Sequence, residues 1–249
     1  MADELSERVL AVVPAWNERG SVAATVKEIA ETGLSIDILV VDDGSTDGTA
    51  AQAMQAGAIT LRMPFNLGVG GAMRAGYRYA VEHNYDVAIQ IDADGQHDPA
   101  FVPDLLAALS SADIVIGARF ARRDDPYRVR GPRRWAMILL AAVLSRLTRT
   151  RLTDVTSGFR ACNRKAMAVF AAHYPAEYLG DTVESLVIAH RMGCTIAQVP
   201  VDMRPRAAGQ PSTSQGRAAL FLGRAGVALL LALVRQWPAH PEPSGGDTR

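Results

Sequence analysis

Short apolar runs alternate with longer segments of mixed polarity along the first half of the chain. Continuous apolar runs bounded by polar or turn-forming residues are typical of buried strands. Such runs predict strands at residues 9–13, 36–41, 58–63, 85–89 and 113–117. The segments between them predict helices that end near residues 32, 56, 80 and 109. This alternation predicts an α/β fold with a mainly parallel central sheet flanked by helices.

Polar residues and prolines predict where these elements begin and end. Pro14 should end the first strand, and Ser21 should cap the first helix. Thr46 or Asp47 should cap the second helix. Asp98-Pro99 should cap and open the fourth, because proline suits the first helical position.

The second half of the chain is less regular. It predicts an apolar segment at 135–144, a loop at 153–160, helices at 164–172 and 181–192, and a strand at 195–203. A last, amphipathic helix should run over 217–235, with Arg217, Arg224 and Arg235 within about 20° of one another on its surface. We expect one domain over 1–235, in two halves (9–119 and 120–235), and a disordered tail over 236–249.

The charge of the chain is balanced overall and uneven locally. A formal net charge of zero over 249 residues argues against a general nucleic-acid binder. Between residues 119 and 151, however, there are ten arginines and no lysine, which predicts a basic patch. The segment 135–144, with Trp135 at one end and arginines on both sides, is either a helix at an anionic lipid surface or an ordinary core helix.

Other features of the sequence bear on whether the protein spans a membrane, is secreted or stays in the cytosol. The longest apolar stretch, 218–234, is shorter than the roughly 20 residues of a membrane-spanning helix, and Arg224 interrupts it. No transmembrane span and no secretory signal are expected. Cys162 and Cys194 lack metal-ligand or redox spacing and are expected to be reduced thiols in the cytosol.

Acidic or amide side chains follow three of the predicted strands. Glu18 follows the first, Asp42-Asp43 the second, and Asp92, Asp94 and Gln96 the fourth. Because parallel strands end at the same edge of a sheet, these groups should gather there. Carboxylate and amide oxygens are the ligands that Mg²⁺ or Mn²⁺ prefers, so a divalent metal carrying a nucleotide diphosphate is expected. The alternative for each loop alone is an ordinary polar turn.

Six ordered motifs covering residues 9 to about 235 resemble those of family-2 glycosyltransferases, most closely the dolichol- or polyprenyl-phosphate mannose and glucose synthases. They are residues 14–18, 41–49, 66–72, 92–97, 157–160 and 199–201. The resemblance implies a GT-A fold and inverting, metal-dependent transfer of a sugar from a UDP- or GDP-sugar to a lipid phosphate.

The resemblance also implies roles for particular residues. Nucleotide contacts fall on Pro14, Ala15, Glu18, Asp43 and Asp92, metal ligands on Asp92, Asp94 and Gln96, and phosphate contacts on Arg119, Arg128, Arg130, Arg133, Arg134 and Arg206. Asp94 and Arg119 would take part in catalysis. A hydroxyl acceptor would also need a carboxylate base, for which Asp181 or Glu184 is the nearest candidate, unless these charges only complement a helix dipole.

The expected partners are a nucleotide-diphosphate sugar, a polyprenyl phosphate, and a membrane surface or small membrane protein, with a homo-oligomer as a further option. The expected location is the cytoplasm, peripheral on the cytoplasmic face of the membrane. Three other functions stay open: transfer to a soluble or cell-wall hydroxyl acceptor, nucleotidyl transfer, and non-catalytic sensing of a nucleotide sugar.

Overall fold

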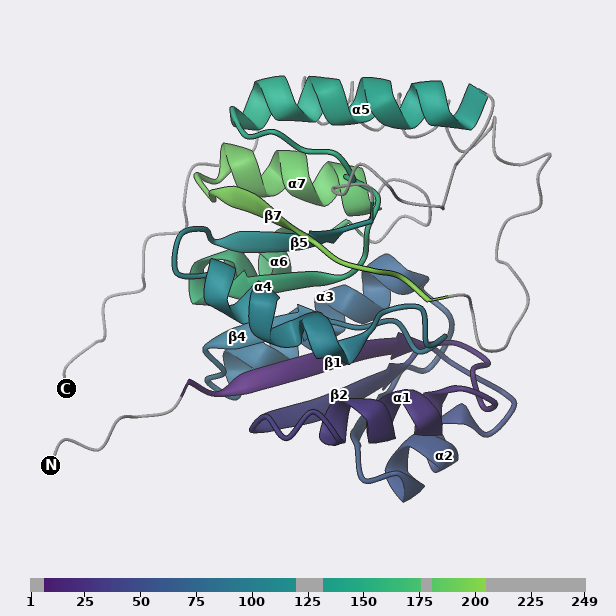
Figure 1. The fold of residues 1–249 in the computed structure, drawn as a ribbon. Coiled ribbons are helices and arrows are strands. Elements are labelled where there is room, and N and C mark those ends of the chain that lie inside the picture. Colours follow the sequence, from purple (N-terminus) through teal and green to yellow (C-terminus); the bar gives the residue numbers. More distant parts are fainter. Residues whose placement is uncertain (1–6, 120–131, 176–180, 205–249) are drawn as a thin grey trace, which may run out of the picture.

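A computed structural model of the chain describes residues 7–119, 132–175 and 181–204. In this part, seven strands form one sheet in the order β3-β2-β1-β4-β6-β5-β7 (Figure 1). The strands are β1 (Val9–Ala15), β2 (Ile36–Asp42), β3 (Ile59–Arg62), β4 (Val87–Gln90), β5 (Ile114–Ala118), β6 (Arg160–Asn163) and β7 (Ile196–Pro200). All neighbours are parallel except β6, which runs antiparallel to β4 and β5. The mainly parallel sheet is confirmed.

Helices cover both faces of the sheet, as the apolar strand runs predict. On one face lie α1 (Val22–Ala30), α2 (Thr49–Gln55), the short 3₁₀ helix η1 (Pro99–Phe101) and α4 (Val102–Ala108). On the other lie α3 (Val69–Glu82), α5 (Pro132–Thr148), α6 (Arg164–His173) and α7 (Asp181–Arg191). The sheet therefore separates two hydrophobic cores, and α5 forms the outermost layer in Figure 1.

Two predicted boundaries are wrong, and one predicted cap lacks its side-chain hydrogen bond. Strand β1 continues through Pro14, which lies opposite Val41 in the parallel register, because an extended strand tolerates proline where no N–H is needed. Ser21 is the N-cap residue of α1, as predicted, but its hydroxyl donates to the Glu18 carboxylate at 2.7 Å and makes no capping hydrogen bond to the helix. The N-cap residue of α2 is Gly48 rather than Thr46 or Asp47. Asp98 does cap the next helix, since its carboxylate accepts from the Ala100 N–H at 3.0 Å.

Helix α3 packs unusually close to the sheet. A Cβ built on Gly76, in the middle of this helix, would lie 2.3 Å from Cγ1 of Val12 on β1. Glycine in a helix interior costs about 1 kcal/mol relative to alanine. Here that cost is offset by a helix–strand contact that no larger residue allows, and the contact fixes α3 beside the strands that end at the candidate site.

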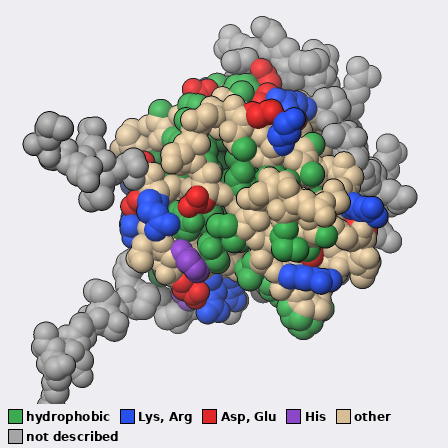
Figure 2. Space-filling view, turned by 90° about the horizontal axis from the view of Figure 1, so that it is seen from below, with side chains coloured by type: hydrophobic (Ala, Val, Ile, Leu, Met, Phe, Trp, Pro, Cys, Tyr) green, Lys and Arg blue, Asp and Glu red, His purple; other side chains and the backbone are tan. Residues whose placement is uncertain are grey.

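Charges of both signs are interspersed on the face that Figure 2 shows, below the sheet as drawn in Figure 1. Among the described residues on this face, no broad area carries basic side chains alone. The mixture of signs on this face agrees with the balanced net charge of the chain.

Two further expectations concern membrane-spanning helices and the state of the two cysteines. Within the described residues, no helix has the length and apolar character needed to cross a membrane. The expected helix at 217–235 and tail at 236–249 lie outside the described residues. Cys162 and Cys194 are free and buried, and burial raises their thiol pKa values to about 12 and about 11. Both are therefore unreactive thiols.

Asp113 links several elements by hydrogen bonds at the edge of the sheet opposite the strand ends that are discussed below. Its Oδ2 accepts from the Thr195 N–H at 2.7 Å and from Lys165 Nζ at 3.0 Å, and its Oδ1 accepts from Asn163 Nδ2 at 2.8 Å. Burial raises the pKa of this carboxyl, but these hydrogen bonds outweigh burial and lower the pKa to about 2. The ionised carboxylate thus joins β5, β6, α6 and the start of β7.

We expect Asp113 to stabilise the fold by about 1–2 kcal/mol near neutral pH. Because its pKa is depressed on folding, this stability is present above the unfolded-state pKa near 3.8 and is lost as the pH falls toward 2. Urea unfolding of wild type and Asp113→Asn should show a difference in unfolding free energy that shrinks between pH 5 and pH 2.5. Asp104→Asn, which neutralises an exposed carboxylate on α4, is the control. A difference that does not change with pH would contradict the assignment.

Candidate active site at the carboxyl edge of the sheet

The strand directions bring the predicted acidic loops together. β2, β1 and β4 are parallel neighbours, so the residues that follow them emerge at one edge of the sheet. β5 and β7 end at the same edge, and the antiparallel β6 begins there. The expectation that Glu18, Asp43, Asp92 and Asp94 share this edge is confirmed. Ligands of open α/β sheets bind at such an edge.

Hydrogen bonds fix the loop after β1 against the loop after β2. The Asn17 N–H donates to Ser45 Oγ at 2.9 Å, and Asn17 Oδ1 accepts from the Thr46 N–H at 3.0 Å. The Glu18 N–H donates to Thr49 Oγ1 at 2.9 Å. Asn17 adopts a positive φ of 54°, which asparagine tolerates better than most residues. The loop that carries Glu18 is therefore already shaped in the free protein.

Asp43 is buried beside the end of β1 and organises a third loop. Its Oδ1 and Oδ2 accept from the N–H groups of Leu67 and Gly68, both at 2.8 Å. Burial raises the pKa of Asp43 above its usual value, and these two hydrogen bonds offset that effect only in part. Gly44 allows the approach, because a Cβ there would lie 2.7 Å from the carbonyl carbon of Phe65. A nucleotide contact by Asp43 stays a prediction.

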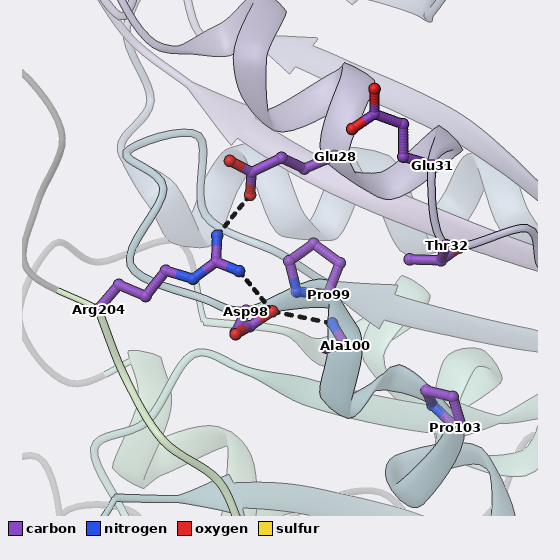
Figure 3. A pocket seen from close by; sticks show the side chains of 8 residues that line it. All are labelled: Glu28, Glu31, Thr32, Asp98, Pro99, Ala100, Pro103 and Arg204. Atoms are coloured by element: carbon purple, nitrogen blue, oxygen red, sulfur yellow. Dashed lines mark hydrogen bonds and ion pairs between the residues drawn. The ribbon is translucent and has the colours of Figure 1, made fainter.

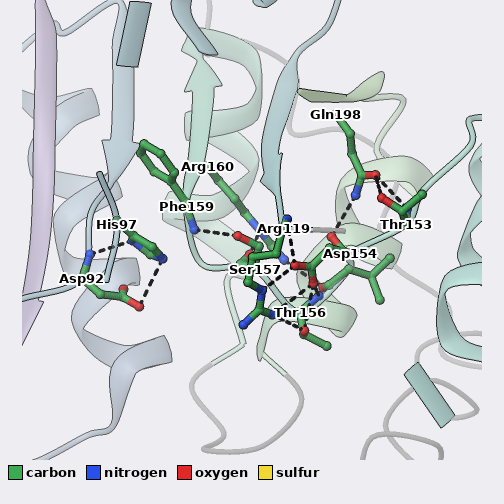
Figure 4. Close-up of polar contacts among 11 residues, drawn as sticks. Asp92, His97, Arg119, Thr153, Asp154, Thr156, Ser157, Phe159, Arg160 and Gln198 are labelled. Carbon is green, nitrogen blue, oxygen red and sulfur yellow. Dashed lines mark hydrogen bonds and ion pairs between the residues drawn. The ribbon is translucent and has the colours of Figure 1, made fainter. Parts of the chain in front are cut away.

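Asp92 follows β4 and is held by two neighbouring side chains, of which Figure 4 shows His97. Its Oδ1 accepts from Gln90 Nε2 at 3.0 Å, and its N–H donates to His97 Nδ1 at 3.0 Å. The His97 ring is buried and stacks on Phe159, with 5.0 Å between ring centroids. The Asp92 side chain itself is 36% exposed, so it remains open to a ligand.

Asp94, Gln96 and Asp98 lie on one tight turn. The buried Asp94 accepts the Gln96 N–H on Oδ1 at 3.0 Å, and Gly95 between them has a φ of 76°. The Gln96 carbonyl accepts from the Arg204 N–H at 3.0 Å. The turn is thus closed by its own hydrogen bonds and by the segment after β7.

The oxygen donors of this turn fit a divalent ion that is shared with a substrate. Within residues 7–119, 132–175 and 181–204, no group of three or more His, Cys, Asp or Glu side chains could hold a metal by itself. Asp92 and Asp94 supply two carboxylates, and Gln96 adds an amide oxygen. Mg²⁺ is commonly bound by one or two carboxylates together with substrate phosphates. The residues therefore suit a metal that arrives with a diphosphate.

Comparison with known proteins decides the family. The model of glycosyl transferase family 2 matches residues 10–170. The chain belongs to this family. It is a glycosyltransferase, and the loops after β1, β2, β3 and β4 lie within the matched region.

The relatives and solved structures agree with this family. The chain is 34% identical to an undecaprenyl-phosphate mannosyltransferase of Micrococcus luteus over 217 residues, covering 84% of this chain and 88% of the relative. It is 29% identical to a polyprenol monophosphomannose synthase of Mycolicibacterium smegmatis over 231 residues, covering 87% and 85%. A glucosyl-3-phosphoglycerate synthase of Mycobacterium tuberculosis, crystallised with Mn²⁺, UDP and phosphoglyceric acid, has a similar fold. Its TM-score is 0.69 at 22% identity, with 92% of this chain and 79% of that chain covered. The GT-A fold is confirmed.

The glycosyltransferase edge also holds a buried ion pair that the sequence alone did not reveal. Arg119 Nε donates to Asp154 Oδ2 at 2.6 Å, and Nη2 donates to Asp154 Oδ1 at 3.2 Å and to Thr156 Oγ1 at 2.9 Å (Figure 4). Burial raises the pKa of Asp154, but Arg119 and the hydrogen bonds from Thr156 together outweigh burial and keep the pKa below its usual value. The predicted phosphate contact of Arg119 stays a prediction, and it would involve a guanidinium already bound to Asp154.

Arg160 is a second arginine with a different role from a surface cation. It is fully buried, and its guanidinium donates to the carbonyls of Ser157, Val155 and Thr182 and to Ser185 Oγ, at 2.8–3.2 Å. These bonds join the loop before β6 to the first turn of α7. The family motif at 157–160 therefore has a structural function in this chain.

The remaining predicted residues are less completely described. Arg128, Arg130 and Arg206 lie outside the described residues. Arg133 and Arg134 fall in the first turn of α5, and Asp181 begins α7, with Glu184 one turn later. Their catalytic or phosphate-binding roles stay predictions.

A shallow pocket lies beside this edge, between α1 and η1 (Figure 3). Arg204 crosses its mouth, with Nη1 2.7 Å from Glu28 Oε2 and Nη2 2.8 Å from Asp98 Oδ1. Because Arg204 also donates its N–H to Gln96, these ion pairs anchor the segment after β7 against the turn that carries Asp94. These ion pairs help to hold the site, and the exposed Asp92 carboxylate is not part of the pocket lining.

We expect Arg119→Gln to lower the free energy of unfolding by about 3–5 kcal/mol, because Asp154 would remain as an unpaired buried charge. The double variant Arg119→Gln/Asp154→Asn leaves no buried charge and should recover most of this loss. Urea unfolding gives the measurement. Arg78→Gln, which breaks an exposed ion pair with Glu82 on α3, should change stability by less than about 1 kcal/mol.

Two outcomes of this comparison are informative about Arg119. If the single variant is as stable as wild type, the structural role of the ion pair is contradicted. If the double variant is stable but transfers no sugar, Arg119 acts on a phosphate in addition to holding Asp154.

Proposed function

We propose that this chain is an inverting, metal-dependent glycosyltransferase that moves a sugar from a UDP- or GDP-sugar to a polyprenyl phosphate. The observation that carries the proposal is the exposed Asp92 carboxylate beside Asp94 on the turn after β4, in a chain whose relatives act on undecaprenyl phosphate and polyprenol. The nucleotide-sugar half would comprise residues 9–119, and the acceptor half residues 120–235.

The proposed chemistry needs little from the protein beyond binding and orientation. An oxygen of the lipid phosphate attacks the anomeric carbon as the bond to the nucleotide diphosphate breaks, and the diphosphate leaves from the opposite side. The attacking oxygen is already anionic at neutral pH, so a strong general base is not required. Mg²⁺ or Mn²⁺ would supply charge stabilisation of the leaving diphosphate.

Roles for the chain's own residues follow from this scheme. Asp92, Asp94 and Gln96 would hold the metal, and Asp92 would also face the nucleotide. The loops fixed by Asn17 and Asp43 would position base and ribose beside Pro14, Ala15 and Glu18. The hydrogen bonds already present within these loops reduce the ordering that donor binding must impose.

The experiment that tests the proposal is sugar transfer to a short polyprenyl phosphate by the purified protein with Mg²⁺ or Mn²⁺. Asp94→Asn should abolish turnover, because it removes the charge of a metal ligand. Asp98→Asn is the matched control and should leave turnover largely intact, since the amide oxygen can still accept from the Ala100 N–H and from Arg204 Nη2, and Arg204 keeps its bonds to Gln96 and Glu28. Loss of activity in both variants, or in neither, would contradict this division of roles.

The donor nucleotide is identified by thermal shift with UDP, GDP and TDP, each with and without Mn²⁺, because binding to the native state raises the melting temperature. The rival functions predict other products. Donor hydrolysis without lipid transfer favours a hydroxyl acceptor, for which Asp181 or Glu184 would be the base. Release of pyrophosphate indicates nucleotidyl transfer, and binding without turnover indicates a sensor.

A lipid acceptor requires contact with a membrane surface, and we propose that α5 makes it on the cytoplasmic face. One side of α5 packs into the core through Leu140, Ala141 and Leu144. On the other side, Ile138 and Leu139 are 48% and 64% exposed. Exposed arginines follow at positions 146, 149 and 151. Exposed apolar side chains next to basic ones suit a bilayer containing anionic lipid.

The double variant Ile138→Asp/Leu139→Asp should bind phosphatidylglycerol vesicles at least several-fold more weakly than wild type in cosedimentation, because charged side chains replace the apolar contact. Val81→Asp, at an exposed apolar position on α3, is the control and should bind as wild type does. Equal binding by the α5 variant would exclude this surface and leave a membrane-protein partner as the route to the lipid.

A further inference from the structure

Gln90 is a buried polar residue at the end of an otherwise apolar strand. Its Nε2 donates to Asp92 Oδ1 at 3.0 Å. Its Oε1 is buried and has no hydrogen-bond partner within the part of the chain that the structure describes. A buried acceptor left unsatisfied costs about 1–3 kcal/mol. Gln90 therefore makes one hydrogen bond at the expense of stability.

The orientation of the Gln90 amide follows from that one bond. Turning the amide over would place Oε1 against Asp92 Oδ1, and two acceptors would face each other. The amide must therefore point its nitrogen at Asp92 and leave Oε1 unpaired. Gly158 on the facing loop makes room, because a Cβ there would lie 2.7 Å from Gln90 Nε2. Gln90 and Gly158 are thus both arranged to allow one hydrogen bond to the Asp92 carboxylate.

His97 holds the same residue from the other side. Its Nδ1 accepts the Asp92 N–H, so in the neutral ring the proton lies on Nε2. Nε2 lies 3.6 Å from Asp92 Oδ2, which is longer than a hydrogen bond and still a favourable contact for an N–H. The ring cannot turn freely, because it is buried and stacked on Phe159 at an interplanar angle of 15°.

We propose that Gln90 and His97 are positioning residues that fix the Asp92 carboxylate for the metal–diphosphate group. The claim rests on the proposed function. Gln90 sets the direction of Oδ1, His97 sets the backbone of Asp92 and faces Oδ2, and the exposed part of the carboxylate is left for the ligand. Groups that orient a metal ligand typically change metal affinity or activity by about 10–100-fold when removed.

Gln90→Met separates positioning from a purely structural role. The variant keeps an unbranched side chain of similar size, removes the unsatisfied oxygen and removes the donor to Asp92. The melting temperature of the free protein should stay the same or rise, while binding of Mn²⁺–UDP or Mn²⁺–GDP weakens about 10–100-fold. Gln90→Glu places a second carboxylate against Asp92 and should weaken binding at least as much. A residue with only a structural role would lose stability instead.

Two substitutions of His97 test the roles of its two ring nitrogens separately. His97→Asn places an acceptor near the position of Nδ1 and should keep most of the binding and kcat. His97→Gln places its amide near the position of Nε2, leaves the Asp92 N–H without its acceptor, and should lose about tenfold or more in both. In ¹⁵N NMR spectra of the free protein, the His97 signals, assigned by their loss in His97→Asn, should be those of the Nε2–H tautomer.

The outcomes distinguish the positioning role from the function on which it rests. Wild-type protein that binds Mn²⁺–UDP or Mn²⁺–GDP but transfers no sugar contradicts the proposed function alone. Wild-type binding of neither nucleotide overturns both. Gln90→Met and His97→Gln that bind and turn over like wild type, or an Nδ1–H tautomer of His97, overturn the positioning role alone.

Discussion

Parallel strand ends at one sheet edge concentrate negative charge, and the loops around that edge depend on how each carboxylate is satisfied. Asp43 takes two backbone N–H groups and thereby shapes residues 65–68. Asp154 takes the guanidinium of Arg119. Asp92 keeps a third of its surface exposed. The same residue type therefore builds loops where it is saturated by the chain and can bind a ligand where it is not.

The sheet could be predicted because continuous apolar runs locate buried strands, and the runs that became β1, β2, β4 and β5 are of this kind. The antiparallel β6 has no comparable run, since only four residues enter the sheet after a polar loop. Strand boundaries were harder still. Pro14 stays within β1, opposite Val41 of β2. A strand tolerates proline where no N–H donor is needed, and that need is set by the neighbouring strands rather than by the local sequence.

The acidic residues of the site could be predicted from their position after strands, and the family from ordered motifs. Their partners could not. Asp154 lies 35 residues from Arg119, and the two meet only because β5 ends at the edge of the sheet where β6 begins. Gln90 carried a weak signal, a polar residue closing an apolar run, whereas the contact of His97 with Phe159 depends on β6 lying beside β4.

These long-range contacts separate the polar residues of the glycosyltransferase edge into those that hold the loops and those that hold another side chain. Asp43, Asp154 and Arg160 use their hydrogen-bonding capacity on the protein. Together they hold the loop after β3, Arg119 at the end of β5, and the loop before β6. Gln90 does the reverse, since it leaves its own oxygen unpaired to hold a neighbouring carboxylate. A fold selected for stability alone would replace Gln90 with an apolar residue. Its presence is best explained by a requirement on Asp92, and this agrees with the proposal that the Asp92 carboxylate takes part in donor binding.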